Sequence, residues 1–209
     1  AVWAGPDDDP SNAGGHVAIV AIADVGHYGT PGSAPDRAAY ERGNSVYLPD
    51  RVVPMLPERL SAGLCSLQQG EDRACLAVRM VFDRHGNKKH HEFLRGIMRS
   101  AARLSYHQAQ RAFDGNPDDD CRAIAKETLA PLWTAYQAMA AARDKRQPLN
   151  LDLPERRVII GEDGKVKSIA YRERLESMRL IEEFMVQANV AAAETLEKAR
   201  VPLIFRVHE

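Results

Sequence analysis

The fold class of this chain follows from one apolar run, His16-Val17-Ala18-Ile19-Val20-Ala21-Ile22-Ala23. The run has the length of a strand and no polar side chain after its first residue, so it predicts a strand buried on both faces. An acidic, turn-rich segment at 3–15 precedes it. Asp24 and a polar cluster at 26–29 follow it, and such a position is favoured for a binding site. The alternative is that Asp24 only caps the turn.

Beyond this run, apolar residues recur at strand and helix spacings. Pro131 should kink or divide the first of two long helices. The pattern therefore predicts an α+β fold (mixed), with a partly antiparallel sheet packed against several long helices. The predicted elements are a short helix at 36–42, an antiparallel pair of strands at 73–83 and 90–105, a short helix from 105, a long helix at 121–146, a hairpin at 156–170, a long helix at 173–200, and a last strand or extended exit at 201–207.

The composition excludes several classes of protein. The 209 residues are 44% apolar and 27% charged, which suits one globular domain or two small ones. The 28 Lys and Arg residues against 29 Asp and Glu residues give a formal net charge of −1. There is thus no global basic signal for nucleic acid, and such a partner would have to use a local groove. No apolar run is long enough to span a bilayer, so we expect no membrane partner.

Cysteine usage bears on the cellular compartment. Cys65, Cys75 and Cys121 show no CxxC spacing, so they suggest neither a disulfide framework nor a zinc site. The sequence shows no charged segment followed by an apolar core that would mark secretion. A reducing cytoplasm fits both observations.

The second informative segment is the proline loop, Arg42-Gly43-Asn44-Ser45-Val46-Tyr47-Leu48-Pro49-Asp50-Arg51-Val52-Val53-Pro54-Met55-Leu56-Pro57. Each proline lacks an amide hydrogen and fixes φ, which excludes a helix or a central strand. Its other side chains are too apolar for a solvated linker, so we predict an ordered, extended loop lying against a core. From chemistry alone, its one aromatic, Tyr47, is more often a packed residue with a satisfied hydroxyl than a functional one.

Two adjacent glutamates, Glu182 and Glu183, stand out in the last predicted helix. Neighbouring helix residues point about 100° apart. With Ile181 and Met185 facing inward, one glutamate must lie near the buried boundary. A carboxylate there needs a cation, a hydrogen-bond donor or a metal-bound partner. No Walker loop, Rossmann glycine fingerprint or nucleophile elbow accompanies the pair.

Seven segments of the chain are similar to the catalytic domain of the ribonuclease II / ribonuclease R exoribonucleases. They occur in family order and extend over nearly the whole chain, which makes the resemblance strong although each segment alone is modest. The segments are IVAIADV (19–25), YGTPGS (28–33), NSVYLP (44–49), PMLP (54–57), LSAGLCSL (60–67), RLIEEFM with ANV (179–185 and 188–190), and FRVH (205–208).

The resemblance implies a processive 3′-to-5′ exoribonuclease that uses divalent metal, Mg²⁺, and releases nucleoside 5′-monophosphates from single-stranded RNA. It assigns stacking on the 3′-terminal base to Tyr47, for which a ring on a rigid loop is suited. It also implies RNA-binding roles for Asn44, Arg206 and His208. The family's second base-clamping aromatic falls at 149–153, where this chain has no Phe or Tyr, so no second clamp is assigned.

The expected catalytic residue in this chain is Glu182, which matches the family's helix glutamate near the scissile end, with Glu183 as the alternative. The family's metal-binding aspartates lie immediately upstream of the position of Ala1, so no metal site is expected within the chain. Asp24, Asp50 and Glu182 would supply at most an outer part of such a cluster.

The resemblance also sets the expected domain organisation. Residues 1–209 are expected to be an internal fragment of a single catalytic domain, without the upstream aspartates, the downstream arginine segment or the flanking RNA-binding domains. We expect this fragment alone to be inactive, although the parent protein is an enzyme. The alternative is a catalytically dead relative that still binds RNA, and a fold-only role is the least favoured reading. No obligate protein partner is evident from the sequence.

Overall fold

The computed structural model describes residues 1–147, 156–171 and 173–205. Its centre is a four-stranded sheet in the order β1-β2-β5-β6, in which every neighbouring pair is antiparallel. The strands are β1 (Val2–Pro6), β2 (His16–Ala23), β5 (Asp72–Phe82) and β6 (Lys88–Arg99). The predicted antiparallel pair is confirmed as β5 and β6, although β6 begins and ends earlier than the predicted range 90–105.

The side chains of β2 are buried to different extents along the strand. Ala18 and Val20 are buried in the core between sheet and helices. Val17 and Ala21, which point to the opposite face, are buried as well. Ile22 is 58% exposed, because the helix-covered core ends at Val20. The prediction of a strand buried on both faces therefore holds for the middle of β2 and is wrong for its end.

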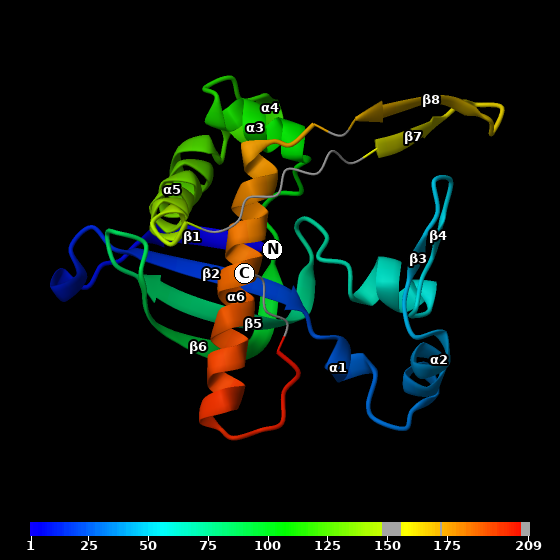
Figure 1. The fold of residues 1–209 in the computed structure, drawn as a ribbon, viewed down its shortest axis with the longest axis horizontal. Helices are drawn as coiled ribbons and strands as arrows, with labels where there is room; N and C mark the ends of the chain where they lie inside the picture. The colour runs from blue at the N-terminus through cyan, green and yellow to red at the C-terminus, as the bar shows by residue number, and fades with distance from the viewer. Residues whose placement is uncertain (148–155, 172, 206–209) are drawn as a thin grey trace.

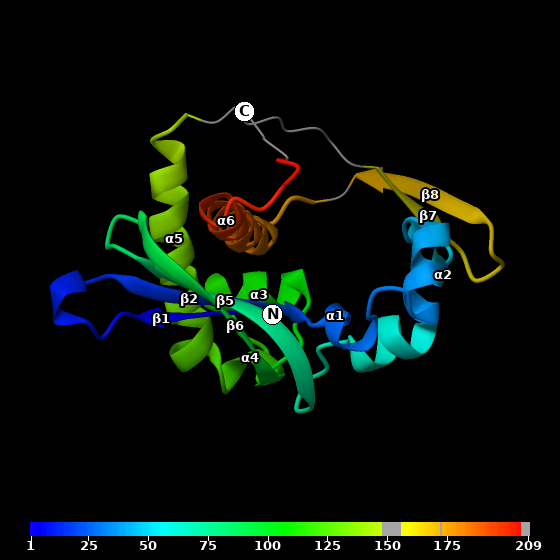
Figure 2. The same ribbon diagram turned by 90° about the horizontal axis from the view of Figure 1, so that it is seen from below.

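Helices α5 (Ala130–Asp144) and α6 (Glu176–Lys198) pack on one face of this sheet, and α3 (Tyr106–Phe113) packs against α6 (Figures 1 and 2). The short α4 (Asp119–Arg122) follows α3. Sheet and helices share one apolar core, which confirms the predicted α+β class. Its members include Val78, Met80, Phe82, Leu132, Met139, Leu180 and Phe184.

The first long helix, predicted at 121–146, is divided. The chain passes from α4 through a π-helical turn (Ala125–Leu129) into α5. Pro131 lies in the first turn of α5, where its missing amide hydrogen removes no intrahelical bond. The predicted division is thus confirmed, and the proline begins a helix.

The second long helix, predicted at 173–200, is α6. It begins at Glu176 because Leu175 still has an extended backbone. Residues 201–205 form no strand, so the extended exit is the alternative that fits the described part, and 206–207 lie outside it. None of the described helices, α6 included, combines the length and apolar character needed to cross a membrane.

Between β2 and β5 the chain forms a separate arm, which we define as residues 25–65. It stands to one side of the sheet (Figures 1 and 2). The short helix predicted at 36–42 is confirmed and begins two residues earlier, because Ser33 caps it by accepting a hydrogen bond from Asp36 N; Gly43 at φ 73° ends it. The arm contains α1 (Val25–Tyr28), α2 (Ala34–Arg42), the strands β3 (Val46–Tyr47) and β4 (Val52–Val53), and a π-helical turn (Arg59–Leu64).

The predicted hairpin near residue 160 is confirmed as β7 (Arg156–Ile160) and β8 (Val166–Tyr171), which pair antiparallel. Gly164 in its turn has φ 75°, a conformation that favours glycine. The hairpin extends from the upper end of α6 toward the same side of the molecule as the arm (Figure 1).

Candidate nucleic-acid interface

The proline loop is an ordered hairpin. Val46 pairs with Val53 and Tyr47 with Val52, and Leu48 N donates to Arg51 O at 2.8 Å to close the turn. Two further bonds hold its base, from Arg42 Nη1 to Pro54 O and from Met55 N to Ser45 Oγ, both at 2.9 Å. The prolines and these bonds together make the backbone that carries Tyr47 rigid.

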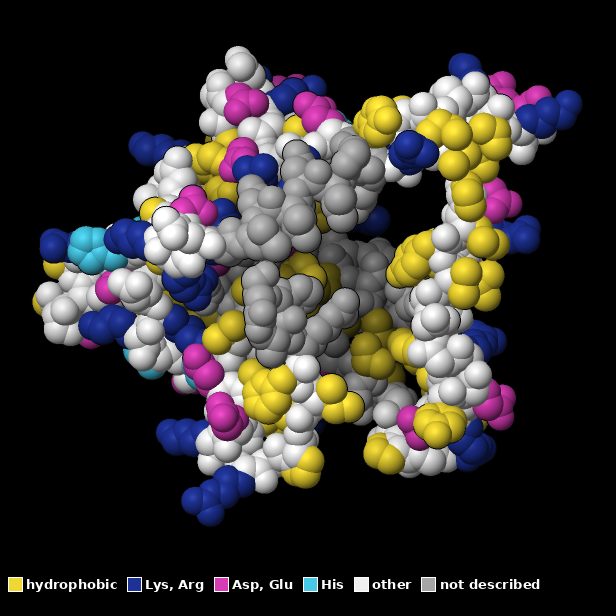
Figure 3. Space-filling view, in the orientation of Figure 1, with side chains coloured by type: hydrophobic (Ala, Val, Ile, Leu, Met, Phe, Trp, Pro, Cys, Tyr) yellow, Lys and Arg dark blue, Asp and Glu magenta, His cyan; other side chains and the backbone are white. Residues whose placement is uncertain are grey.

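The hairpin does not lie against a core. Tyr47 is 78% exposed, and the apolar side chains of both short strands are exposed too. The expected packing is therefore wrong, because none of the described helices or strands covers the side chains of these two short strands. Figure 3 shows hydrophobic side chains along the arm and on β7–β8. Asn44, beside this hairpin, is exposed as well.

The two adjacent glutamates of α6 have different surroundings. Glu183 is buried, with 2% of its surface exposed, and accepts hydrogen bonds from Arg143 Nη1 and Gln187 Nε2, both at 3.0 Å. The prediction that one glutamate of the pair lies at the buried boundary with a cation is confirmed for Glu183, although Met185, which was expected to face inward, is 54% exposed. The side chain of Glu182 is 63% exposed, and its carboxylate lies 3.8 Å from Arg174 Nη2.

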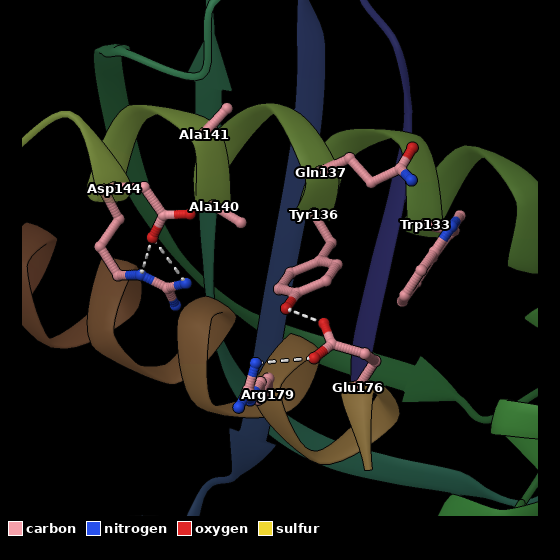
Figure 4. A pocket seen from close by; sticks show the side chains of 9 residues that line it. Trp133, Tyr136, Gln137, Ala140, Ala141, Asp144, Glu176 and Arg179 are labelled. Atoms are coloured by element: carbon pink, nitrogen blue, oxygen red, sulfur yellow. Dashed lines mark hydrogen bonds and ion pairs between the residues drawn. The ribbon is translucent and has the colours of Figure 1, made fainter. Parts of the chain in front are cut away.

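A polar network joins α5 to the first turn of α6 around a shallow pocket (Figure 4). Tyr136 Oη donates to Glu176 Oε2 at 2.8 Å, and Arg179 Nη1 donates to Glu176 Oε1 at 2.8 Å. Burial, followed by the hydrogen bond to Glu176, raises the pKa of Tyr136. Trp133 at the rim stacks on Phe113 at a ring-centroid distance of 4.4 Å. These contacts fix α6 against α5, so the carboxylates of Glu176 and Glu183 hold the helix in place.

At the end of β2, Asp24 forms an ion pair with Arg95 of β6. Arg95 donates through Nε to Oδ2 and through Nη2 to Oδ1, the latter at 3.0 Å. Asp24 is 7% exposed, and its hydrogen bond with Arg95 lowers the pKa of the carboxyl group. Asp24 occupies the N-cap position of α1, where its carbonyl oxygen accepts from His27 N at 3.1 Å, but its side chain makes no cap bond and pairs with Arg95. A groove lined by Gly26, Thr30 and Ile97 runs past the pair.

The described residues do not fit a metal site of their own. Within 1–147, 156–171 and 173–205, no three His, Cys, Asp or Glu side chains gather in a way that could hold a metal ion. Asp24 is neutralised by Arg95, and Asp50, on the hairpin turn, lies 3.7 Å from Arg51. Asp24, Asp50 and Glu182 thus belong to separate elements and form no such cluster.

Some expected site residues fall outside the described part of the chain. These are Arg206, His208 and the region 149–153. Conversely, Arg95 and Arg143 could not be recognised from the sequence as partners of these carboxylates. Each of them is recognised only by its partner in space, Asp24 being 71 residues away and Glu183 40 residues away.

A family model described as the RNB domain matches residues 9–209. Ribonuclease R of Aquifex aeolicus is 41% identical over 196 residues, which are 91% of this chain and 27% of that protein. Ribonuclease R of Escherichia coli is 36% identical over 203 residues, 96% of this chain and 25% of that protein. The chain thus spans about a quarter of the length of these curated relatives.

Solved structures of ribonuclease R also resemble this chain. Mycoplasma genitalium RNase R in complex with ribose methylated single-stranded RNA matches with a TM-score of 0.91 at 30% identity, covering 100% of this chain and 32% of that one. Yeast Ssd1, described as a pseudonuclease, matches with a TM-score of 0.67 at 19% identity, over 92% of this chain and 23% of that one, which shows the fold alone. With a family model that covers almost all of its residues, this chain belongs to the RNB domain family.

Proposed function

We propose that the protein to which this chain belongs is a processive 3′-to-5′ exoribonuclease, which hydrolyses single-stranded RNA to nucleoside 5′-monophosphates. The observation that carries the proposal is the RNB domain match over 9–209, together with ribonuclease R relatives that align with more than nine-tenths of the chain. Charge agrees with a local RNA site, since a net charge of −1 leaves no general affinity for polyanions.

Tyr47 is the residue that stacks on the 3′-terminal base in this proposal. Its ring is 78% exposed on a hairpin held by backbone and side-chain bonds, so it meets a base without first leaving a core. Stacking on an aromatic ring is tolerant of sequence, as a processive enzyme requires, because every base has a π-face. Asn44 precedes the hairpin and is proposed to bind RNA beside it. RNA binding is also proposed for Arg206 and His208, which lie outside the described residues.

Between the two glutamates, Glu182 is the one we propose near the scissile end. Glu183 already accepts bonds from Arg143 and Gln187, and both of its oxygens are engaged. Glu182 faces solvent, with Arg174 3.8 Å away, so its carboxylate remains accessible to substrate.

The proposed reaction also needs a divalent metal, for which we propose Mg²⁺. Bound metal would polarise the phosphodiester and activate water. The described residues do not fit that ion by themselves, so we propose that aspartates immediately upstream of Ala1 hold it. Ala1 N lies 2.7 Å from Ala21 O, and β1 runs antiparallel to β2. Continued backward, β1 would pass beside Ile22 and Ala23 toward Asp24, at the root of the arm that carries Tyr47.

A second candidate function is that of a catalytically dead RNA-binding relative. The likeness to yeast Ssd1 shows that this fold also occurs in a protein described as a pseudonuclease. The residues that would hold the metal distinguish an active enzyme from a dead relative, since the enzyme needs carboxylates upstream of Ala1. In either case we propose a cytoplasmic protein with no obligate protein partner, consistent with three free thiols.

The experiment that tests the proposal compares the complete protein with residues 1–209 alone, on 5′-labelled single-stranded RNA, with Mg²⁺ and with EDTA. We expect the complete protein to shorten the RNA from its 3′ end and release monophosphates only with Mg²⁺. The fragment should leave the RNA intact. A complete protein that binds the RNA without shortening it would establish the second candidate, and activity of the fragment would refute the proposed upstream metal site.

A further inference from the structure

The arm joins the sheet at two roots. At the second root, where the chain returns to β5, Gly70 N donates to Ser100 O at 2.8 Å and Arg103 N to Gln69 Oε1 at 3.1 Å. Arg73 Nε also donates to Ser66 O at 3.0 Å. Several bonds, most of them to backbone, therefore hold this root to the sheet and to the end of β6.

At the first root, one backbone bond and one ion pair tie the chain to its neighbouring strands. Asp24 N donates to Ala74 O at 3.0 Å, which is the last link of β2 to its neighbour before the arm begins. Beyond it, the carboxylate of Asp24 is held by the fork of Arg95, and its side chain is only 9% exposed against 67% for Arg95. A two-pronged bond between guanidinium and carboxylate fixes orientation as well as distance.

The position of the pair shows what it can control. Asp24 is directly followed by α1, the first element of the arm, and the chain reaches Tyr47 through α1, α2 and β3. A small rotation at the root is therefore carried to the hairpin at the far end. A displacement of about 1 Å at a reacting centre can cost on the order of 100-fold in rate.

Simpler roles do not account for the pair. Asp24 makes no side-chain cap bond to α1, and Arg95 engages both of its oxygens. The surface pair Arg99–Asp72 has the same fork, with bonds of 2.7 and 2.9 Å, yet it joins β5 to β6 within the sheet and both of its side chains are more than half exposed. The Asp24–Arg95 pair differs in being buried on its acidic side and in lying where the arm begins.

We infer that Asp24 and Arg95 form a positioning pair that fixes the orientation of the arm, and with it the Tyr47 ring, relative to the sheet and α6. The inference rests on the base-stacking role proposed for Tyr47. Neither residue contacts the substrate in this role, and both act through the hairpin.

The test uses the complete protein with Arg95→Ala, and with Arg99→Ala as the matched control. Spin labels at Tyr40→Cys on α2 and Thr134→Cys on α5, in a Cys65→Ser background, report the distance from arm to body by double electron–electron resonance. Tyr40 is 89% exposed, so its label has room. We expect Arg95→Ala to shift or broaden the distance distribution, and Arg99→Ala to leave it unchanged.

Single-stranded RNA digestion gives the second readout. Arg95→Ala should change the length of the final product in the same direction as Tyr47→Ala and lower kcat/KM on the order of tenfold. The double variant should behave like Tyr47→Ala alone, since Arg95 acts through that ring. Unchanged distances, equal effects of Arg99→Ala, or fully additive losses in the double variant would overturn the inference. If the wild-type protein degrades no RNA, the proposed function fails, and the distance measurement still decides whether the pair positions the arm.

Discussion

Single residues of this chain are committed either to structure or to the proposed chemistry, and burial separates the two groups. Glu183 and Tyr136 are buried, and each bonds to a partner on the facing helix, α5 or α6. Tyr47 and Glu182 are exposed to solvent. A polar group that is already satisfied in the interior is costly to recruit for a substrate, because its partner would be left unpaired. Exposed groups on rigid elements carry no such cost.

Tyr47 gives a direct test at this scale. Because stacking needs the ring alone, Tyr47→Phe should bind single-stranded RNA like the wild type, and Tyr47→Ala should lose about 1–3 kcal/mol of binding free energy. Fluorescence anisotropy with labelled RNA, in the complete protein with EDTA to prevent cleavage, measures both. Tyr40→Ala is the control, since Tyr40 is 89% exposed on the same arm but outside the hairpin. Equal losses for the two alanine variants would remove Tyr47 from its proposed role.

The adjacent glutamates give a second test. Glu183→Gln leaves Arg143 without its buried carboxylate and should lower the free energy of unfolding by roughly 1–3 kcal/mol, less than for a fully buried pair because Arg143 is 31% exposed. Glu182→Gln should change it by less than about 1 kcal/mol, because its pair with Arg174 is solvent-exposed. Urea unfolding measures both.

Activity of the complete protein should show the opposite order for these two variants. Glu182→Gln is expected to lower kcat with little loss of stability, whereas Glu183→Gln is expected to act through stability. If Glu183→Gln abolishes activity in a protein that unfolds at the wild-type urea concentration, the proposed assignment passes to Glu183.

At the scale of elements, local pattern predicted the long strands and helices but missed β1 (Val2–Pro6), most of which falls in the segment 3–15 that was expected to be a turn-rich loop. Three signals depend only on residues that are close in sequence, and their elements form as predicted. They are the apolar run of β2, the turn before β6 and Pro131 at the start of α5. The exposure of the proline hairpin was mispredicted. Apolar composition indicates that side chains favour burial, but it does not show whether another element covers them.

Long-range pairs could not be predicted for a related reason. Asp24 and Arg95 are 71 residues apart, and periodicity carries no information about which charge meets which across a sheet. The glutamate pair was an intermediate case. Helix geometry predicted one carboxylate near the buried boundary, with a cation, a hydrogen-bond donor or a metal-bound partner beside it. That the partner is a cation, Arg143, depends on how α5 packs against α6.

At the scale of the whole molecule, the chain divides into a body with a core and an arm without one. The buried apolar side chains belong to the sheet and the helices on it, and none of those described lies in the arm. Phe184 is fully buried in the body, where it joins α6 to the sheet and to α5. Amides of the arm should therefore exchange hydrogen faster than those of β2 and β5, since local opening there breaks few buried contacts.

Phe184→Ala tests this division. Loss of a buried phenylalanine lowers the free energy of unfolding by about 3–5 kcal/mol. Because β2, β5, α5 and α6 share one core, the protection of their amides from hydrogen exchange should fall together. The arm should exchange as it does in the wild type, because its opening does not depend on that core. Hydrogen–deuterium exchange with mass spectrometry, on the complete protein, resolves the two regions. If amides of the arm lose protection to the same extent as those of the sheet, the arm unfolds together with the core. Its orientation would then be set by global folding, and the Asp24–Arg95 pair would not be its principal anchor.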